Sequence, residues 1–154
     1  MGVANERSIA WGIARAVYQQ GGKLGFTYQG DALKKRIIPL AQSVNSDFVF
    51  PCDVSSAESV DTVFKEIKLK WGHLDFVVHA IAYSDKEELK GGYVDTSQEN
   101  FDKTMNISCY SFTAICQRAR SLMINGGSLL TLTYFGAERV MPHYNVMGLS
   151  LIPI

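Results

Sequence analysis

Short apolar runs alternate along the chain with longer stretches in which apolar residues recur every three to four positions. The runs have the length and β-branched content of buried strands, and they cover 23–29, 47–54, 74–82 and 128–133. The periodic stretches predict helices over 8–20, 31–44, 57–71 and 98–123. Strands that alternate with helices are typical of a parallel sheet with helices on both faces. The pattern therefore predicts an α/β fold.

Three elements can be described more closely. Pro39 lacks a backbone N–H and is expected to kink or restart the helix over 31–44. The segment 74–82 is nearly all apolar, which predicts a strand in the centre of the sheet. Thr96 or Ser97 is expected to cap the long last helix. The inner face of that helix would carry Phe101, Met105, Ser108, Phe112 and Ile115.

The composition gives no reason to expect a nucleic acid, a membrane or a metal ion as a partner. The 154 residues include fifteen basic and fifteen acidic side chains, so charge gives no reason to expect nucleic acid or an anionic membrane as a partner. No apolar run reaches the length of a membrane span, and the start of the chain lacks a signal-peptide core. Three cysteines without CxxC spacing suit reduced thiols in a cytoplasmic protein. The three histidines are scattered, so no metal site is expected, and His79 is interpreted as a core residue.

Two tyrosines follow the last predicted strand. Tyr134 comes directly after the strand over 128–133, and Tyr144 lies ten residues further on, before a short apolar segment. In open α/β sheets chemistry collects at the carboxyl ends of the strands, so the two hydroxyls form a candidate acid site. From spacing alone, the alternative is a pair of amphipathic tyrosines that pack an edge of the sheet.

Several positions suit a nucleotide. A glycine before a helix N-terminus, as at Gly2 and Ser8, allows backbone N–H groups to approach a pyrophosphate, although such spacing also occurs in ordinary loops. Gln29 ends the first predicted strand, where a dinucleotide-binding unit meets the ribose. Its neutral side chain favours NADH, while lysines in the next helix would suit NADPH. Asp53 either contacts the nucleotide or caps the following helix.

The residues around the tyrosines resemble a known active-site segment. The string Tyr134-Phe-Gly-Ala-Glu-Arg, followed by Pro142-x-Tyr144-Asn-Val-Met-Gly, is similar to that of bacterial NADH-dependent enoyl-[acyl-carrier-protein] reductases, members of the short-chain dehydrogenase/reductase superfamily. The likeness is colinear from Gly2 to Ser150 and includes a Gly-x5-Ser-Ile-Ala loop. It implies a Rossmann-like doubly wound parallel sheet that is incomplete, because the family's first strand and C-terminal part are absent. Residues 1–154 would form a single partial NAD-binding domain.

The resemblance also implies a role for individual residues. Tyr144 would donate a proton or hydrogen bond to the substrate, with Tyr134 as a second, less essential catalytic tyrosine. Ser84 would contact the substrate. The residues expected to bind the cofactor are Gly2, Ser8, Ile9, Gln29, Asp53, Val54 and Ile81.

The family reduces the trans-2 double bond of an acyl chain carried on acyl carrier protein, with NADH, in fatty acid biosynthesis. The full-length family is expected to be homotetrameric. This sequence departs from the family's Tyr-x6-Lys pattern, because Leu151 stands at the lysine position and the tail Leu151–Ile154 differs. The chain itself is therefore expected to be inactive, and the alternative is a truncated, non-catalytic fragment that binds nucleotide or docks on a subunit. A generic alcohol dehydrogenase is disfavoured, because it would need lysine where Gly148 stands.

Overall fold

The strands form two small parallel sheets. The computed structural model describes residues 1–152, so the last two residues of the Leu151–Ile154 tail lie outside the described part. Strand β1 (Gly25–Tyr28) pairs with β2 (Phe48–Pro51), and β3 (Phe76–His79) pairs with β4 (Ser128–Thr131). Both pairs are parallel, but no strand joins β1 to β3 in the described residues. The predicted Rossmann-like parallel architecture is confirmed, and it is incomplete at its centre.

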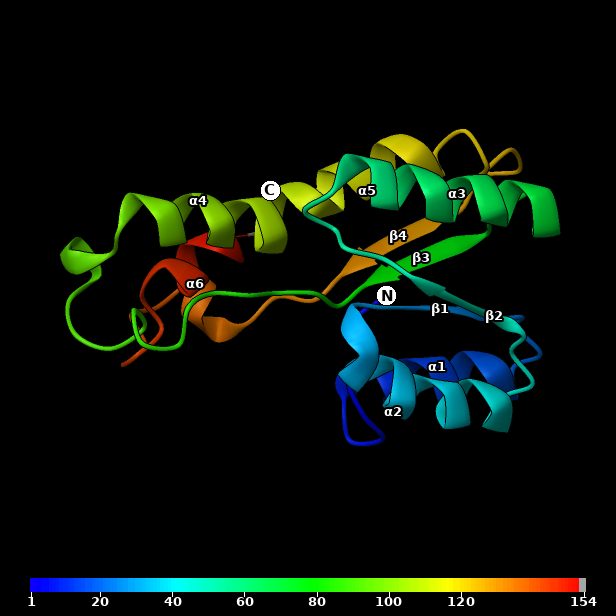
Figure 1. The fold of residues 1–154 in the computed structure, drawn as a ribbon, viewed down its shortest axis with the longest axis horizontal. Coiled ribbons are helices and arrows are strands. Elements are labelled where there is room, and N and C mark those ends of the chain that lie inside the picture. The colour runs from blue at the N-terminus through cyan, green and yellow to red at the C-terminus, as the bar shows by residue number, and fades with distance from the viewer. Residues whose placement is uncertain (153–154) are drawn as a thin grey trace.

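Helices cover the strands on two sides (Figure 1). Helices α1 (Ile9–Gln19) and α2 (Gly30–Ser43) lie on one side, and α3 (Ala57–Trp71) and α5 (Ser111–Ala119) lie on the other. Each layer has its own buried cluster of apolar side chains, one around Phe26 and Ile37 and one around Phe48 and Ile115. Beyond the sheet, α4 (Gln98–Met105) and α6 (Asn145–Ser150) lie together. The remaining helical turns are η1 (Tyr93–Asp95), η2 (Asn106–Tyr110) and η3 (Phe135–Ala137).

Helix α3 has the predicted bounds because both of its ends are encoded locally. The Ser56 side chain accepts a hydrogen bond from the Ser59 backbone N–H at 3.2 Å, which satisfies a donor of the first turn. Gly72 ends the helix in a left-handed conformation with φ of 76°, which glycine adopts without steric cost. Ser56, and not Asp53, is therefore the cap.

Of the two effects expected of Pro39, a kink or a restart, the restart does not occur, because α2 continues from Gly30 to Ser43 as one element. The missing proline N–H would have bonded the carbonyl of Lys35. Both Lys35 and Pro39 are exposed, so water can satisfy that carbonyl. The helix is held by its opposite face, where Ile37 and Ala41 are fully buried.

The predicted helix over 98–123 is interrupted, which is a second correction. Ser97 caps α4 by accepting from the Asn100 N–H at 3.1 Å, but the five residues of η2 form a π-helical turn before α5. The fully buried face also differs from the expected one, because Phe101 and Phe112 are only half-buried. Hydrogen bonds explain the difference, since polar side chains along this face bind each other and the neighbouring loop. These polar residues are Asn100, Thr104, Ser108 and Ser111.

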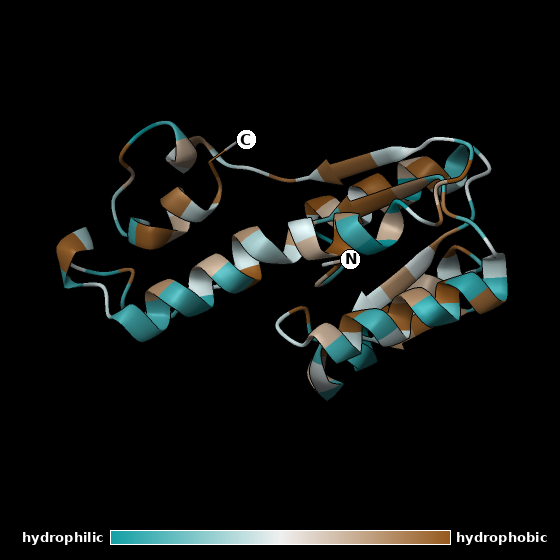
Figure 2. Ribbon diagram, turned by 90° about the horizontal axis from the view of Figure 1, so that it is seen from above, coloured by the Kyte–Doolittle hydropathy of each residue, from teal (hydrophilic) through white to brown (hydrophobic). Residues whose placement is uncertain are grey.

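The strand predicted as buried over 128–133 is exposed in its observed part, β4. Leu129 and Leu130 are 37% and 43% exposed. Figure 2 shows hydrophobic residues along both strands of the β3–β4 sheet, of which β3 lies nearer the helices. Within the described residues β4 has a strand partner on one side only. The strand predicted as central, β3, also has β4 as its one strand partner here, and Met1 bonds its other edge through the Val78 carbonyl and the Ala80 N–H. The apolar run was correctly predicted to be a strand. Its burial depends on which other elements pack against it, and the sequence pattern does not show this.

No helix within residues 1–152 is long and apolar enough to cross a membrane. Three or more histidine, cysteine or carboxylate side chains do not gather into a metal-binding group anywhere in this described range.

His79 ends β3 as a buried and hydrogen-bonded residue, as its sequence position suggested. Its side chain is 1% exposed, with Nε2 at 2.8 Å from the Ser111 hydroxyl and Nδ1 at 3.2 Å from the Thr131 hydroxyl. Burial is the main cause that lowers the pKa of His79 from 6.5 to about 4. The neutral imidazole therefore belongs to the folded state.

We expect the free energy of unfolding to fall as the pH is lowered from about 6.5 to about 4. In that window the unfolded chain binds a proton at His79 and the folded chain does not, so the slope from this group approaches about 1.4 kcal/mol per pH unit. Urea unfolding of wild type and His79→Gln across this range measures it, with the exposed His73→Gln as control. An equally steep profile in His79→Gln would contradict the assignment.

Candidate functional site

A cleft opens where the carboxyl ends of three strands meet the loop at the start of the chain. Its volume is about 480 Å³. The loops after β1, β2 and β3 contribute to its walls, as expected of a ligand site in a parallel α/β sheet. Five of the seven predicted cofactor residues line it, namely Gly2, Gln29, Asp53, Val54 and Ile81.

Gly2 allows the first loop to pass close against β3. Its φ is +93°, and an added Cβ would lie 2.0 Å from the carbonyl oxygen of Ala80. No side chain fits there, so glycine is required by both conformation and space. The backbone of this loop therefore borders the cleft directly, before the chain turns into α1.

Ser8 and Ile9, also predicted to bind cofactor, do not line this cleft. Ser8 precedes α1, and its hydroxyl donates to the Asn5 carbonyl at 2.7 Å instead of capping the helix. Ile9 is 71% exposed at the helix N-terminus. The sequence correctly places Ser8 and Ile9 at the start of α1. The spacing of the residues does not reveal the path of the preceding loop, so it could not show whether the two residues reach the cleft.

Asp53 faces the cleft with a fixed carboxylate. Its Oδ1 accepts from the Ser55 hydroxyl at 2.6 Å and from the Ser55 backbone N–H at 2.9 Å. These hydrogen bonds, led by that from the Ser55 hydroxyl, lower the pKa of Asp53 below its ordinary value. The group is an anionic hydrogen-bond acceptor beside Val54, which suits contact with an amino group and an apolar ring face.

Lys103 and Tyr83 line the same cleft and were not predicted. The Lys103 ammonium lies 4.9 Å from the centre of the Tyr83 ring, a cation–π arrangement between α4 and the loop after β3. Lys103 is an ordinary surface lysine in the sequence. Only the tertiary packing of α4 brings it to the cleft, so no local signal could have identified it.

The two candidate catalytic tyrosines contact each other away from this cleft wall. The ring centroids of Tyr134 and Tyr144 are 5.1 Å apart in an edge-on arrangement. Tyr134 follows β4 and is 48% exposed, whereas Tyr144 is half-buried before α6. Burial, and then the neighbouring Tyr134, raise the pKa of Tyr144 above 10, so its hydroxyl stays protonated at neutral pH.

Two glycines set the position of Tyr144, and sequence analysis did not identify them. An added Cβ at Gly136 would lie 2.5 Å from the Tyr144 ring, and one at Gly148 would lie 2.5 Å from the Gly136 carbonyl oxygen. Helix α6 thus packs against η3 through glycine on both sides. In the sequence these residues look like a loop glycine and a helix glycine, and neither indicates the contact.

Ser84, the predicted substrate contact, is 9% exposed and belongs to a buried polar network. Its hydroxyl accepts from Thr104 at 2.9 Å and from the Asn100 amide at 3.1 Å, and the Asn100 carbonyl oxygen also accepts from the Asp85 N–H. In η2, the Ser108 hydroxyl accepts a hydrogen bond from the backbone N–H of Tyr83, the residue before Ser84, and donates one to the Tyr83 carbonyl. The network anchors the loop to α4. The polar residues at three-to-four spacing in α4 and η2 were the signal that could have revealed it.

The arrangement of the cleft defines a class of protein. A parallel sheet whose strand ends share a cleft with a glycine loop and a helix start is typical of dinucleotide-binding α/β proteins. The observed cleft fits such a group, because Gly2 leaves its backbone open and Asp53 and Val54 provide one polar and one apolar contact.

Comparison with known proteins gives the family. A family model described as Enoyl-(Acyl carrier protein) reductase matches residues 2–151. Enoyl-[acyl-carrier-protein] reductase [NADH] 2 of Rhizobium meliloti is 63% identical over 150 residues, which are 97% of this chain and 56% of the relative. The chain belongs to the enoyl-(acyl carrier protein) reductase family.

Solved structures agree. The crystal structure of FabI from Candidatus Liberibacter asiaticus superposes with a TM-score of 0.96 at 53% identity, covering 98% of this chain and 58% of that one. A reductase from Anaplasma phagocytophilum in complex with NAD gives a TM-score of 0.94 at 60% identity, covering 97% of this chain and 57% of that one. The chain therefore spans a little over half the length of the proteins it matches.

Proposed function

We propose that the protein carrying these residues reduces the trans-2 double bond of an enoyl chain on acyl carrier protein, with NADH, in fatty acid biosynthesis. The observation that carries the proposal is the contact between Tyr134 and Tyr144, where a neutral Tyr144 hydroxyl, whose pKa burial raises further, can donate a hydrogen bond. Family membership over residues 2–151 supports the reaction class. Residues 1–154 would act as a single partial NAD-binding domain.

The proposed cofactor residues divide into two groups. Gly2, Gln29, Asp53, Val54 and Ile81 would hold the dinucleotide in the cleft, and Ser8 with Ile9 would border it from the start of α1. When bound, the cofactor supplies the hydride that reduces the β-carbon of the acyl chain. The neutral Gln29 favours NADH.

Tyr144 would act on the thioester. Negative charge develops on the thioester oxygen as the double bond is reduced, and a neutral hydroxyl can donate a hydrogen bond to that oxygen. In a site from which water is excluded, such a donor is worth about 3–4 kcal/mol. Gly136 and Gly148 would fix the Tyr144 ring, Tyr134 would pack against it, and Ser84 would support the loop that faces the acyl chain. The partners would be enoyl-acyl carrier protein and, in the whole protein, three further subunits.

A second candidate function rests on Leu151, which stands where the family has lysine. Its carbonyl accepts from the Thr133 hydroxyl at 2.6 Å, and its side chain cannot bind a ribose hydroxyl. With no ammonium at this position, the 154-residue chain would bind nucleotide without turnover.

One experiment separates the two. In a hybrid reductase, residues 2–150 of this chain replace the matching segment of the Rhizobium meliloti relative; a second hybrid also keeps Leu151. NADH oxidation with a short trans-2-enoyl thioester is expected for the first hybrid and is expected to be lost from the second and from the 154-residue chain. Turnover by the 154-residue chain would disprove the need for lysine. NADH binding without turnover in the first hybrid would overturn the reductase proposal.

A further inference from the structure

Tyr144 stands between two residues with unusual backbone conformations. His143 and Asn145 have positive φ angles of 57° and 30°. Positive φ is uncommon for residues other than glycine, although asparagine and histidine are enriched there. Such conformations persist where the surrounding structure holds them. The backbone that presents the Tyr144 ring therefore depends on contacts with other parts of the chain.

The side chain of Asn145 makes one such contact. Its Nδ2 donates a hydrogen bond to the backbone carbonyl of Glu88 at 3.1 Å, across 57 positions of the sequence. Asn145 is half-buried at the start of α6, whereas Glu88 lies in the loop that follows β3. The bond therefore joins the backbone next to Tyr144 to a loop from a distant part of the sequence.

Glu88 is itself fixed to the start of α4. Its carboxylate accepts from the Ser97 hydroxyl at 2.8 Å and from the Ser97 backbone N–H at 2.9 Å. Ser97 in turn caps α4 by accepting from the Asn100 N–H. These bonds hold the Glu88 carbonyl in place as a partner for Asn145. We call the chain of bonds from Asn145 through Glu88 to Ser97 the tether.

The predicted substrate contact, Ser84, is held by the same end of α4. The Asn100 amide donates to the Ser84 hydroxyl at 3.1 Å, and the Asn100 carbonyl oxygen accepts from the Asp85 backbone N–H at 2.9 Å. The loop over 84–97 is therefore attached to α4 near both of its ends. The tether connects this loop to the backbone of Tyr144.

We propose that Asn145 is a positioning residue, which through the tether holds Tyr144 in register with the loop over 84–97. This inference rests on the proposed reductase function and deepens it, because the Tyr144 hydroxyl and the Ser84 loop would have to meet the same acyl thioester. Misplacement of a reacting group by about 1 Å can lower a catalytic rate by roughly 10²-fold. A single amide in the tether can therefore matter for turnover without touching the substrate.

Two substitutions separate the hydrogen bond of Asn145 from its backbone conformation. Asn145→Gly keeps the positive φ but has no side chain to donate, and Asn145→Asp keeps the shape but places an acceptor against the Glu88 carbonyl. In the first hybrid reductase, each is expected to lower kcat by at least about tenfold and to raise KM for the enoyl thioester. KM for NADH should stay unchanged, because neither Asn145 nor Glu88 lines the cofactor cleft.

Asn45 provides a matched control. It also has a positive φ, of 51°, and its side chain donates to the Tyr18 hydroxyl at 2.7 Å in an exposed place. Asn45→Gly and Asn45→Asp are expected to leave kcat and both KM values unchanged. Glu88→Ala is expected to reproduce the effect of Asn145→Gly. The double variant should lose little more than either single one, because both substitutions break the same tether.

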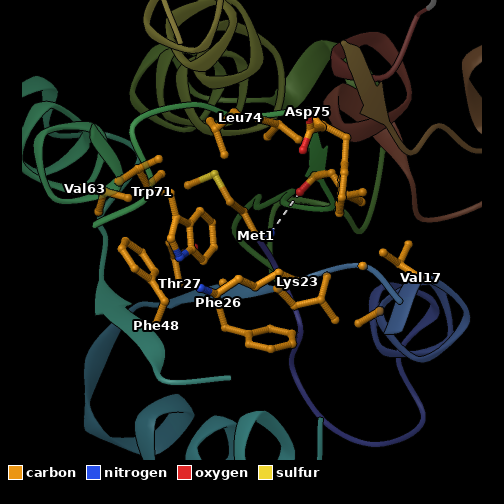
Figure 3. Close-up of a pocket in the computed structure, with 18 of the residues that line it drawn as sticks. Met1, Val17, Lys23, Phe26, Thr27, Phe48, Val63, Trp71, Leu74 and Asp75 are labelled. Carbon is orange, nitrogen blue, oxygen red and sulfur yellow. Dashed lines mark hydrogen bonds between the residues drawn. The ribbon is translucent and has the colours of Figure 1, made fainter. Parts of the chain in front are cut away.

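Hydrogen exchange detects the tether without any reaction. In the 154-residue chain, the amides of 85–97 are expected to exchange faster in Asn145→Gly and Asn145→Asp than in wild type, while those of α3 keep their rates. Tryptophan emission reports whether the core stays folded. Figure 3 shows Trp71 in the wall of an apolar cavity of about 370 Å³ bordered by β1 and β3, and neither Glu88 nor Asn145 lines this cavity. The emission is therefore expected to stay as in wild type.

Three results would count against these expectations. Wild-type kinetics in Asn145→Gly and Asn145→Asp, or unchanged exchange over 85–97, would overturn the proposal. A lower kcat with unchanged KM and faster exchange throughout the chain would also overturn it, because Asn145 would then only stabilise the fold. A wild-type hybrid that does not oxidise NADH would instead disprove the proposed function, and exchange over 85–97 would still decide whether Asn145 holds the loop.

Discussion

Replacing Tyr144 with phenylalanine in the hybrid reductase is expected to lower kcat by roughly 10²–10³-fold, with little change in KM for NADH. The substitution removes the one hydroxyl that the proposal assigns to the developing negative charge. It keeps the ring that contacts Tyr134 at 5.1 Å between centroids, so the packing stays intact. Steady-state NADH oxidation with a trans-2-enoyl thioester measures both constants.

Tyr134→Phe is the matched control. Tyr134 is 48% exposed and stands as the second tyrosine, so its change should cost less than about tenfold. Equal losses in the two variants would mean that the hydroxyls act as a pair. A larger loss in Tyr134→Phe would reverse their assigned roles.

The Gly2→Ala substitution is expected to weaken NADH binding to the hybrid reductase by at least about tenfold. An alanine Cβ would meet the Ala80 carbonyl oxygen at 2.0 Å in a backbone with φ of +93°, so the loop must move out of the cleft wall. The left-handed conformation alone costs a non-glycine residue about 1–2 kcal/mol. Fluorescence titration with NADH measures the affinity, and urea unfolding measures the stability.

Gly12→Ala is the control for the general effect of replacing a glycine with alanine where no steric clash results. Gly12 lies inside α1, and an added Cβ there meets no atom within 4 Å. Alanine in a helix interior is better than glycine by about 0.8–1 kcal/mol, so this variant should bind NADH normally and unfold no earlier than wild type. Normal NADH affinity in Gly2→Ala would show that the loop does not border the cofactor.

Sequence periodicity predicted the elements well because most of them are defined locally. Helix α3 has both its serine cap and its glycine stop in the sequence, and its observed bounds are the predicted ones. The π-helical turn in the long helix was missed because the apolar spacing continues through it, and within that turn Ser108 bonds the loop after β3. The burial of β4 was wrong for a similar reason, since an apolar run does not reveal which elements will cover it.

In the candidate site, too, the sequence predicted residues whose place follows from the local chain, and it missed residues that only tertiary packing brings there. Gln29 was predicted because it directly follows a strand, and strand ends of a parallel sheet meet at one edge. Asp53 and Ile81 lie two residues past their strands and were predicted from the family resemblance; all three line the cleft. Lys103 and Gly136 were missed because their neighbours come from other elements. The family resemblance gave the tyrosines their order of importance, and that order stays a prediction. The structure shows that the two rings are in contact and that burial raises the pKa of Tyr144.

The proposed reaction is tested most directly by following the hydrogen that is transferred. The first hybrid reductase is supplied with NADH that carries deuterium at its transferable position and with a trans-2-enoyl thioester, and the product is analysed by mass spectrometry and NMR. We expect a saturated acyl thioester with deuterium at the β-carbon, and loss of this product in the Tyr144→Phe variant. Oxidation of NADH without a saturated, β-deuterated product would contradict it.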